Sequence, residues 1–507
     1  MEEKPIKFGT DGWRGVIAAD FTYERVEKVA PAAARVLAEV YGEAAQSQTI
    51  IVGYDRRFMA EEFARTAAEA LLEAGFEVLL SQTYAPTPAF SWAANDRKAL
   101  GAIVITASHN PAPYLGLKVK GSFGGSVPPE VTKKIEARLR EASEEGSQAL
   151  SGQALTGGGH GGTAPTRYMT GHGSQKRAAG ALQTFNVWPS YCAMLANKVD
   201  LDSIREAIRS EEVTVFADVM HGAGSGGLGE ILGLPVREIN GDRDPLFDGG
   251  APEPLPRYLS KLFRSLRTYQ RQKSSGISVG FVFDGDADRI AAVDSQGNFL
   301  SSQILIPILI EHLSQTRGLT GEIVKTVSGS DLIPAIAALY NLPLFETPIG
   351  YKYIADRMLE QQVLIGGEES GGIGYGTHVP ERDALLSALY VLEAIVKSGR
   401  DLSQLYARLQ EKTGYTFVYD RIDLPLSSME VRERLLSRLQ NSPPTEIAGQ
   451  EVVDCLTVDG YKFRLGDRSW LLIRFSGTEP VLRLYCEAPT FERVRTILAW
   501  AKNWANS

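Results

Sequence analysis

Three aspartates, Asp284, Asp286 and Asp288, stand at every second position of the sequence DGDADR. They directly follow the apolar run GFVF, so we expect them at the end of a buried strand. Carboxylates held together in a buried place repel one another unless a cation neutralises them. Oxygen ligands on an open loop suit Mg²⁺, and a solvated acidic turn is the alternative. An EF-hand is excluded, because Arg289 and Ser295 stand where its loop requires glycine and glutamate.

A second candidate for chemistry is Ser108, in the stretch AIVITASHNP. An apolar run leads up to this serine, and His109, Asn110 and Pro111 then break the strand. A serine hydroxyl is a weak nucleophile without a base or a metal, and the GxSxG elbow of hydrolases is missing here. We therefore favour a phosphorylated serine facing the cation. Taken alone, Ser108 is equally consistent with a turn residue.

A third stretch, GGEESGG at 366–372, places Glu368, Glu369 and Ser370 between glycines. Glycines allow close approach of the backbone, and a carboxylate beside a hydroxyl suits the hydroxyl groups of a sugar. An ordinary loop explains this stretch equally well.

A fourth stretch, RFSGTEPVLRLY at 474–485, combines basic side chains with small hydroxyl residues. Arg474, Ser476, Thr478 and the backbone of 476–478 can form a phosphate cradle, with Arg483 nearby. The alternative is an ordinary hairpin that carries common surface residues.

The elements that must position these residues alternate between strand and helix patterns. Strand patterns occur at 49–55, 77–83, 99–110, 213–219, 236–240, 278–284, 322–328, 343–349 and 363–369, and helical patterns at 59–75, 350–361 and 381–399. This alternation predicts largely parallel sheets covered by helices. Ser108, Asp284 and Glu368 each follow a strand, and ligands bind beyond the carboxyl ends of such strands. We expect the three strand ends to converge on one cleft.

At about 100–200 residues per domain, a chain of 507 residues has room for three or four domains. After about residue 415 the strands shorten, and a final helix is predicted near 491–504. The expected fold is therefore three α/β domains with mixed or parallel sheets and a smaller C-terminal α+β domain around one cleft. Their expected boundaries are 1–183, 184–298, 299–413 and 414–507. Residues 142–183 are rich in Gly, Ser, Ala and Thr, which predicts a flexible segment within the first domain.

The overall composition narrows the class of protein. A net charge of −8 argues against general nucleic-acid binding, and no apolar run is long enough to predict a membrane span. The N-terminus has no apolar segment typical of a signal peptide. Cys192, Cys455 and Cys486 are far apart in the sequence, which favours a reduced, cytoplasmic setting. We expect a monomer or a homodimer that binds neither nucleic acid nor membranes.

Taken together, the motifs resemble those of the α-D-phosphohexomutases, which include phosphoglucomutase, phosphomannomutase and phosphoglucosamine mutase. The resemblance runs along nearly the whole chain, through FGTDGWRG (8–15), GYDRR (53–57), APTPA (85–89), TASHNP (106–111), DGDADR (284–289), TPIGYKYI (347–354), GEESGG (367–372) and RFSGTEP (474–480). The family has four domains, which agrees with the expected organisation.

The resemblance implies a role for each candidate residue. Ser108 carries the phosphoryl group, which completes an Mg²⁺ site formed by the three aspartates. Arg14 and Lys118 lie near the transferred group, with Lys118 a candidate general base, and Arg289 and His109 support the same centre. The residues implied to bind substrate are Glu368, Ser370 and Lys352 for the sugar and Arg474, Ser476, Gly477, Thr478 and Arg483 for its non-reacting phosphate.

The mechanism implied by the resemblance begins with transfer of the phosphoryl group from Ser108 to a hexose monophosphate. The resulting hexose 1,6-bisphosphate, which also serves as the activator, turns around in the cleft. Ser108 then takes back the other phosphate. Both orientations place one phosphate in the same cradle, and closure of the fourth domain would exclude water.

Two positions bear on the substrate. Many phosphomannomutase-like and glucosamine-type members have His at the position of Gly372 and a non-acidic residue at that of Glu369. We therefore expect conversion of glucose 1-phosphate to glucose 6-phosphate, with mannose phosphates as further substrates. A glucose 1,6-bisphosphate synthase that uses fructose 1,6-bisphosphate as donor and a phosphoglucosamine mutase are the alternatives.

Two more distant alternatives use the same residues differently. In a haloacid-dehalogenase-type phosphotransferase Asp284 would be the nucleophile, but TASHNP would then have no role. In a non-catalytic sugar-phosphate sensor the complete catalytic set would be unnecessary.

Overall fold

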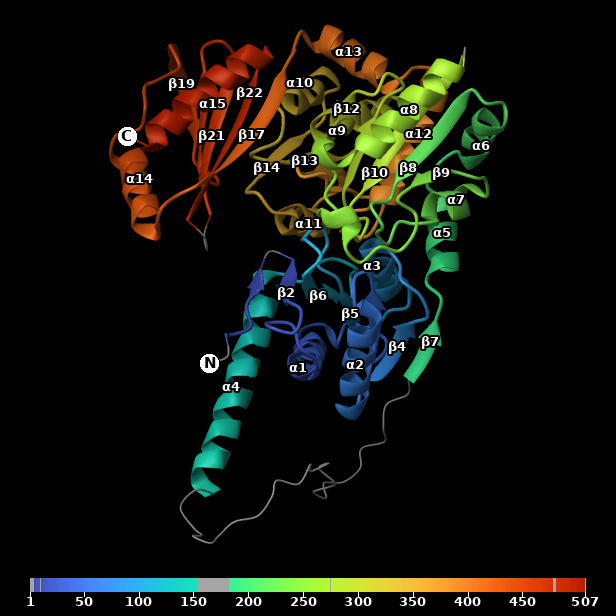
Figure 1. Cartoon of the computed structure of the whole chain (residues 1–507), viewed down its shortest axis with the longest axis vertical. Helices are drawn as coiled ribbons and strands as arrows, with labels where there is room; N and C mark the ends of the chain where they lie inside the picture. Colours follow the sequence, from blue (N-terminus) through green and yellow to red (C-terminus); the bar gives the residue numbers. More distant parts are fainter. Residues whose placement is uncertain (1–3, 10, 154–181, 274, 477–479, 507) are drawn as a thin grey trace.

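The computed structural model describes residues 4–9, 11–153, 182–273, 275–476 and 480–506. Four β-sheets succeed one another along the chain, each with its own helices (Figure 1). The second and third sheets lie side by side above the first, and the C-terminal sheet stands apart from the first (Figure 1).

The first sheet has the strand order β1-β2-β6-β5-β3-β4-β7. Its strands are β1 (Phe8–Gly9), β2 (Gly12–Val16), β3 (Thr49–Tyr54), β4 (Glu77–Ser81), β5 (Gly101–Ile105), β6 (Tyr114–Gly121) and β7 (Leu182–Phe185). β3, β4, β5 and β7 are parallel, whereas β6 runs antiparallel to both β5 and β2. The accompanying helices are α1 (Tyr23–Tyr41), α2 (Ala60–Glu73), α3 (Thr87–Asp96) and α4 (Pro129–Gln153).

The second sheet has the order β12-β11-β10-β8-β9, with β8, β9 and β10 parallel and β11 antiparallel to β10. Its strands are β8 (Val213–Asp218), β9 (Arg237–Ile239), β10 (Ile277–Phe283), β11 (Ile290–Val293) and β12 (Phe299–Leu300). The helices of this part of the chain are α5 (Trp188–Ala196), α6 (Leu201–Arg209), α7 (Gly227–Leu232) and α8 (Ser260–Gln272).

The third sheet has the order β14-β13-β15-β16, in which only β16 is antiparallel. Its strands are β13 (Glu322–Thr326), β14 (Leu344–Thr347), β15 (Val363–Gly367) and β16 (Ile373–Tyr375). Its helices are α9 (Ser302–Glu311), α10 (Leu332–Leu339), α11 (Tyr351–Glu360), α12 (Ala384–Ser398) and α13 (Leu402–Thr413).

The C-terminal sheet is antiparallel throughout, with the order β17-β22-β21-β20-β19-β18. Its strands are β17 (Val418–Pro425), β18 (Glu446–Ile447), β19 (Gln450–Leu456), β20 (Tyr461–Leu465), β21 (Trp470–Phe475) and β22 (Val481–Ala488). Helices α14 (Met429–Asn441) and α15 (Phe491–Asn506) accompany it. The predicted fold class, three mixed α/β units and a smaller C-terminal α+β unit, is confirmed.

The three α/β sheets share one local feature. In each, a buried parallel strand turns back into an antiparallel neighbour, at β5–β6, β10–β11 and β15–β16. The loop after β5 contains Ser108, the loop after β10 contains the aspartate triplet, and the loop after β15 contains Glu368. The three predicted functional loops therefore occupy equivalent hairpins of three similar sheets.

The hydrophobic cores do not correspond one to one with the four sheets. One continuous cluster of buried residues extends from Ile51 in the first sheet, through Phe283 in the second, to Ile365 in the third. The C-terminal domain has a separate core, in which Leu484 and Ile497 are buried. None of the helices in the described ranges combines the length and apolar character that crossing a bilayer requires.

The ends of the segment 142–183 differ from the predicted flexible connection. α4 continues to Gln153, and β7 begins at Leu182, so both ends are regular structure. Residues 142–153 lack an apolar stripe, but the Ala, Glu, Gln and Leu residues among them favour a helix. Residues 154–181, which make up the rest of the predicted segment, lie outside the described residues.

Candidate active site

The aspartate triplet forms the hairpin loop between β10 and β11. Asp284, Asp286 and Asp288 are fully buried, and one carboxylate oxygen of each lies within 4.8 Å of the others. Asp284 Oδ1 accepts hydrogen bonds from the backbone N–H groups of Asp288 and Arg289, each at 3.1 Å, which fixes the curvature of the loop. Burial, followed by repulsion from Asp288 and Asp286, raises the pKa of Asp284 well above its usual value.

The loop offers oxygens that fit a divalent cation. Asp286 Oδ1 and Asp288 Oδ1 are buried, and neither has a hydrogen-bond partner among the described residues. A buried carboxylate oxygen without a partner is costly, and a hard cation would satisfy both oxygens. The triplet could therefore bind a metal ion, as its spacing in the sequence predicts.

Ser108 lies directly against this loop. Its hydroxyl, almost fully buried, donates a hydrogen bond to Asp284 Oδ2 at 2.9 Å and lies 3.3 Å from His109 Nδ1. Its backbone is left-handed, with φ of +51°, an uncommon conformation for a residue other than glycine and one that is often found at functional sites. A Cβ at Gly285 would lie 2.4 Å from the carbonyl oxygen of Ser108, so only glycine lets the two loops approach this closely.

Arg57 holds the serine loop in this conformation, a role that the sequence did not predict. Its guanidinium donates to the carbonyl oxygens of Ser108 and Asn110, both at 2.6 Å, and to those of Pro111 and Tyr114, both at 3.2 Å. Four carbonyl groups of one loop are thus tied to a single buried side chain. The only signal was its place in the motif GYDRR, to which no role had been given.

Asp55 supports the same loop through Thr106 and Arg57. It lies 3.4 Å from Arg57 and accepts a hydrogen bond at 2.6 Å from Thr106, whose hydroxyl accepts one from the N–H of Ser108 at 2.9 Å. Burial raises the pKa of Asp55 to about 6, against the opposing effect of Arg57. The Asp55 carboxylate, the Thr106 hydroxyl and the Arg57 guanidinium therefore form a connected set of contacts that holds the backbone of Ser108.

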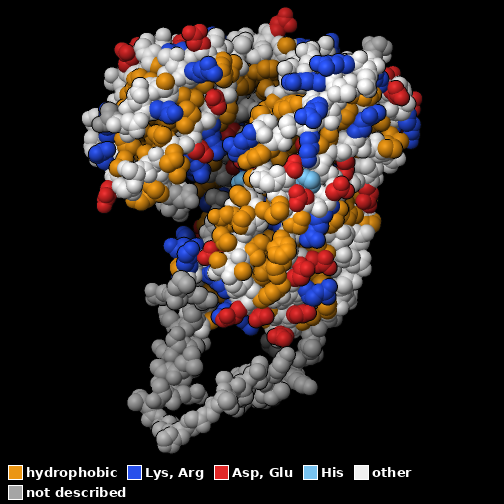
Figure 2. Space-filling view, in the orientation of Figure 1, with side chains coloured by type: hydrophobic (Ala, Val, Ile, Leu, Met, Phe, Trp, Pro, Cys, Tyr) orange, Lys and Arg blue, Asp and Glu red, His pale blue; other side chains and the backbone are white. Residues whose placement is uncertain are grey.

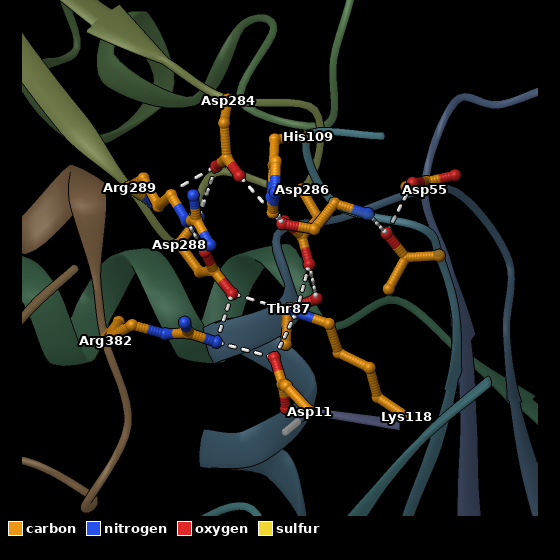
Figure 3. Close-up of polar contacts among 12 residues, drawn as sticks. Asp11, Asp55, Thr87, His109, Lys118, Asp284, Asp286, Asp288, Arg289 and Arg382 are labelled. Atoms are coloured by element: carbon orange, nitrogen blue, oxygen red, sulfur yellow. Dashed lines mark hydrogen bonds and ion pairs between the residues drawn. The ribbon is translucent and has the colours of Figure 1, made fainter. Parts of the chain in front are cut away.

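Lys118, on β6, reaches the triplet from the first domain (Figure 3). Its ammonium lies 2.8 Å from Asp286, 2.9 Å from Asp288 and 2.8 Å from Asp11. Burial disfavours the charged form, but the three carboxylates outweigh it and raise the pKa of Lys118 well above its usual value. The role of Lys118 as a general base stays a prediction.

Arg382 joins the triplet to the third domain, and it was not predicted either. Its Nη2 lies 2.6 Å from Asp11 and 2.8 Å from Asp288 (Figure 3). Its Nη1 is 3.8 Å from Glu368. The side chain occupies the space beside Gly372, where a Cβ would meet its Cδ at 2.4 Å. Arg382 lies two residues before α12, and neither its type nor its position in the sequence indicates these contacts.

The predicted sugar loop is attached directly to the aspartate loop. The N–H of Ile290 donates to the carbonyl of Gly371 at 2.9 Å, and Arg289 pairs with Gly372 as an isolated bridge. Glu368 is buried at the base of this loop, and burial raises its pKa to about 7, against the opposing charge of Arg382. Ser370 is partly exposed at its tip.

Three further predicted residues lie at the same centre. Arg14, on β2, donates to Asn110 Oδ1 at 2.7 Å, and Arg289 Nε is buried without a hydrogen-bond partner among the described residues. Burial, followed by the charges of Arg289 and Arg14, lowers the pKa of His109 well below its usual value. His109 is therefore neutral, and its two basic neighbours favour binding of an anion here.

Lys352 approaches this centre from the third domain. Together with Asp11 and Gly12 it lines a cavity of about 520 Å³. Its ammonium also lies 4.8 Å from the centre of the Tyr353 ring.

The predicted phosphate cradle lies apart from this centre, on the C-terminal domain. Arg474 and Arg483 are paired directly opposite each other on β21 and β22, an arrangement of like charges that favours an anion between them. Ser476 is buried next to them, whereas Gly477 and Thr478 lie outside the described residues. In the described part of the chain, no hydrogen bond or ion pair joins these residues to Ser108. Figure 2 shows the surface hollowed between the C-terminal and N-terminal domains.

Comparison with known proteins shows which family the chain resembles. The four phosphoglucomutase/phosphomannomutase domain models match in order: α/β/α domain I at 5–146, domain II at 189–297, domain III at 301–413 and the C-terminal domain at 435–500.

Individual relatives agree over nearly the whole chain. A phosphoglucomutase/phosphomannomutase of Thermococcus kodakarensis is 28% identical over 97% of this chain and 96% of its own. A phosphoglucosamine/phosphogalactosamine mutase of Sulfurisphaera tokodaii is 30% identical over 95% of each chain. A structure assigned as a phosphomannomutase from Thermus thermophilus superposes with a TM-score of 0.80 at 31% identity, covering both chains completely. The chain therefore belongs to the phosphoglucomutase/phosphomannomutase family of phosphohexomutases, which are intramolecular phosphotransferases.

Proposed function

We propose that this phosphohexomutase interconverts glucose 1-phosphate and glucose 6-phosphate through a phosphoserine at Ser108 and a glucose 1,6-bisphosphate intermediate. The observation that carries the proposal is the 2.9 Å hydrogen bond between Ser108 Oγ and Asp284 of the triplet. A phosphoryl group on Oγ would lie against the oxygens that fit Mg²⁺. Bound Mg²⁺ would supply positive charge to stabilise the phosphoryl group during transfer.

The first transfer moves the phosphoryl group from Ser108 to the sugar. The C6 hydroxyl oxygen of glucose 1-phosphate attacks the phosphorus, and the bond between phosphorus and Ser108 Oγ breaks. Oγ keeps the electron pair and takes up the proton that the hydroxyl group loses. In the return transfer, Ser108 Oγ attacks the phosphorus at C1, and the bond between that phosphorus and the C1 oxygen breaks. The C1 oxygen keeps the electron pair and takes up the proton that Oγ loses, which yields glucose 6-phosphate and restores the phosphoserine.

The residues around Ser108 suit an anionic group in transfer. Arg14 and Arg289 supply positive charge on the side of His109, and Lys118 lies beside the triplet, where it can balance charge. Glu368, ionised, can accept hydrogen bonds from sugar hydroxyls, with Ser370 at the same loop. Arg474, Ser476 and Arg483, with Gly477 and Thr478, would hold the non-reacting phosphate, and Lys352 the substrate between the two ends.

A phosphorus NMR time course tests the proposal. The enzyme is incubated with Mg²⁺ and glucose 1-phosphate, with and without fructose 1,6-bisphosphate. Accumulation of glucose 6-phosphate with only trace bisphosphate supports a mutase. Accumulation of glucose 1,6-bisphosphate only with fructose 1,6-bisphosphate would instead identify a bisphosphate synthase.

A second candidate substrate is glucosamine phosphate, because a 30% identical relative is named a phosphoglucosamine/phosphogalactosamine mutase. Measuring kcat/KM for glucose, mannose and glucosamine 1-phosphates separates the candidates. The highest value for glucose 1-phosphate supports our proposal, and the highest for glucosamine 1-phosphate would replace it.

A further inference from the structure

Asp459 links the phosphate cradle to the third domain. It lies in the turn between β19 and β20, and its Oδ2 accepts two hydrogen bonds of 3.0 Å. One comes from Arg474 Nε within the same domain, and the other from the backbone N–H of Ile349 in the third domain. A single carboxylate oxygen therefore fixes a cradle arginine and also holds it to a neighbouring domain.

The turn is built to approach Arg474 closely. Gly460 has φ of +87°, and a Cβ there would lie 2.5 Å from the carbonyl oxygen of Ile473 and 3.2 Å from Arg474 Cβ. A side chain at this position would push the turn, and Asp459 with it, away from the arginine. Glycine thus allows the contact that the carboxylate makes.

The other partner of Asp459 lies just before a residue proposed to hold substrate. Ile349 follows β14, and Lys352 is the second residue of α11, three positions further on. Ile349 also packs against an apolar cluster formed by Trp470 and Leu472 of the C-terminal sheet with Val327 of the third domain. The domain contact is therefore apolar at its centre, with Asp459 adding a directed polar link.

We propose that Asp459 is a positioning residue for binding of the non-reacting phosphate. By engaging Nε, it restricts rotation of the Arg474 guanidinium and leaves the terminal nitrogens as the donors for phosphate. Through Ile349 it also sets the distance between Arg474 and the segment that leads into α11. The inference rests on the proposed function, since it takes Arg474 as a phosphate ligand.

The consequence for the reaction concerns the intermediate. Glucose 1,6-bisphosphate must turn around while it is bound, so a poorly oriented Arg474 would allow more of it to escape. We expect Asp459→Ala to raise KM for glucose 1-phosphate about tenfold, the usual scale for a lost charge-assisted hydrogen bond. The bisphosphate released per turnover, measured by phosphorus NMR, should also rise.

A matched control variant distinguishes positioning of Arg474 by Asp459 from a general loss of stability. Asp467, in the same domain, also accepts from an arginine Nε (Arg493, 2.7 Å) and from a backbone N–H (Ser469, 3.0 Å). Asp467→Asn should lower the melting temperature while KM and bisphosphate release stay unchanged. If Asp459→Ala fails to fold, KM and bisphosphate release are measured for Asp459→Asn instead. This variant keeps an acceptor oxygen but loses the charge.

Arg474→Ala separates the inference from the proposed function. If Arg474→Ala itself leaves KM unchanged, the cradle assignment in the proposed function is wrong. If Arg474→Ala raises KM but both Asp459 variants remain within twofold of wild type, the inference alone is overturned. The double variant should match Arg474→Ala, because Asp459 acts through that arginine, and an additive effect would also contradict the inference.

Discussion

Ser108 and Asp284 lie 176 residues apart in the sequence, yet the serine hydroxyl donates to the aspartate carboxylate at 2.9 Å. The bond crosses from the hairpin of the first sheet to the hairpin of the second. It places the Ser108 hydroxyl of TASHNP in contact with the loop that fits a cation. The proposed phosphoryl transfer depends on this contact between Ser108 and the aspartate loop.

Replacing Ser108 with alanine should abolish turnover while sugar-phosphate binding remains. The variant lacks the oxygen that carries the phosphoryl group but keeps the residues proposed to bind substrate. Turnover is measured with glucose 1-phosphate and added bisphosphate, and binding of glucose 6-phosphate by calorimetry. Unchanged turnover would contradict a phosphoserine mechanism.

Mg²⁺ should stabilise the folded protein through the triplet. A ligand that binds only the folded state at 100 times its Kd adds about 2.7 kcal/mol to the free energy of unfolding. We expect Asp286→Asn to abolish the rise in melting temperature caused by Mg²⁺, and chelation to abolish activity. Asp218→Asn is the matched control, since Asp218 is an equally buried aspartate at the end of β8 outside the triplet. An equal loss of the Mg²⁺ effect in both variants would refute the assignment.

Arg57→Lys should lower kcat by about two orders of magnitude, because displacing a reacting group by about 1 Å costs roughly that much. A lysine cannot donate simultaneously to the four carbonyl groups that Arg57 holds. The neighbouring Arg56 donates to Gly241 and stacks on Tyr84 instead, so Arg56→Lys should leave kcat nearly unchanged. Similar kcat values for both variants would show that the serine loop does not need this anchor.

A side chain at Gly372 should be tolerated only when Arg382 is shortened. Forcing a Cβ against Arg382 Cδ costs about 1–3 kcal/mol in a packed site. Chemical denaturation of Gly372→Ala should show that loss, and the same substitution in an Arg382→Ala background should cost clearly less. Additive losses in the double variant would mean that the two positions do not compete for space.

The pH dependence of activity should reveal Glu368. With a pKa of about 7, it is mostly protonated at about pH 6 and mostly ionised at about pH 8. Only the ionised form offers both oxygens to sugar hydroxyls, so kcat/KM should increase as pH rises through this range. The ratio of wild-type kcat/KM to that of Glu368→Gln should rise about tenfold, which also cancels titration of the substrate phosphate. A flat ratio would show that Glu368 does not titrate in substrate binding.

The sequence predicted the places where chemistry is concentrated better than the residues that hold them. Ser108, Asp284 and Glu368 were found because each follows an apolar strand, and the ends of such strands meet at one edge of a sheet. The domain boundaries and the roles of individual residues stay predictions.

Arg57, Arg382 and Asp11 escaped notice for a common physical reason. Each acts through contacts between distant parts of the chain, and Arg382 reaches Asp11 across 371 positions. No local pattern records such a contact, because burial of a charged side chain depends on partners brought together only by folding. The continuation of α4 to Gln153 differs from the prediction because a composition rich in Gly, Ser, Ala and Thr is typical of a flexible segment, yet part of 142–183 is helical.

The equivalence of the three hairpins makes the site modular. The β15–β16 hairpin is closed by the pair Gly367–Ile373 and attached to its neighbour by the Arg289–Gly372 bridge. A graft from a relative that preserves these two connections could exchange the sugar-facing turn and leave the Ser108 hairpin untouched. Such a graft is expected to change substrate preference more than phosphoryl transfer, provided that the contacts of Arg382 with Asp288 and Glu368 are also kept.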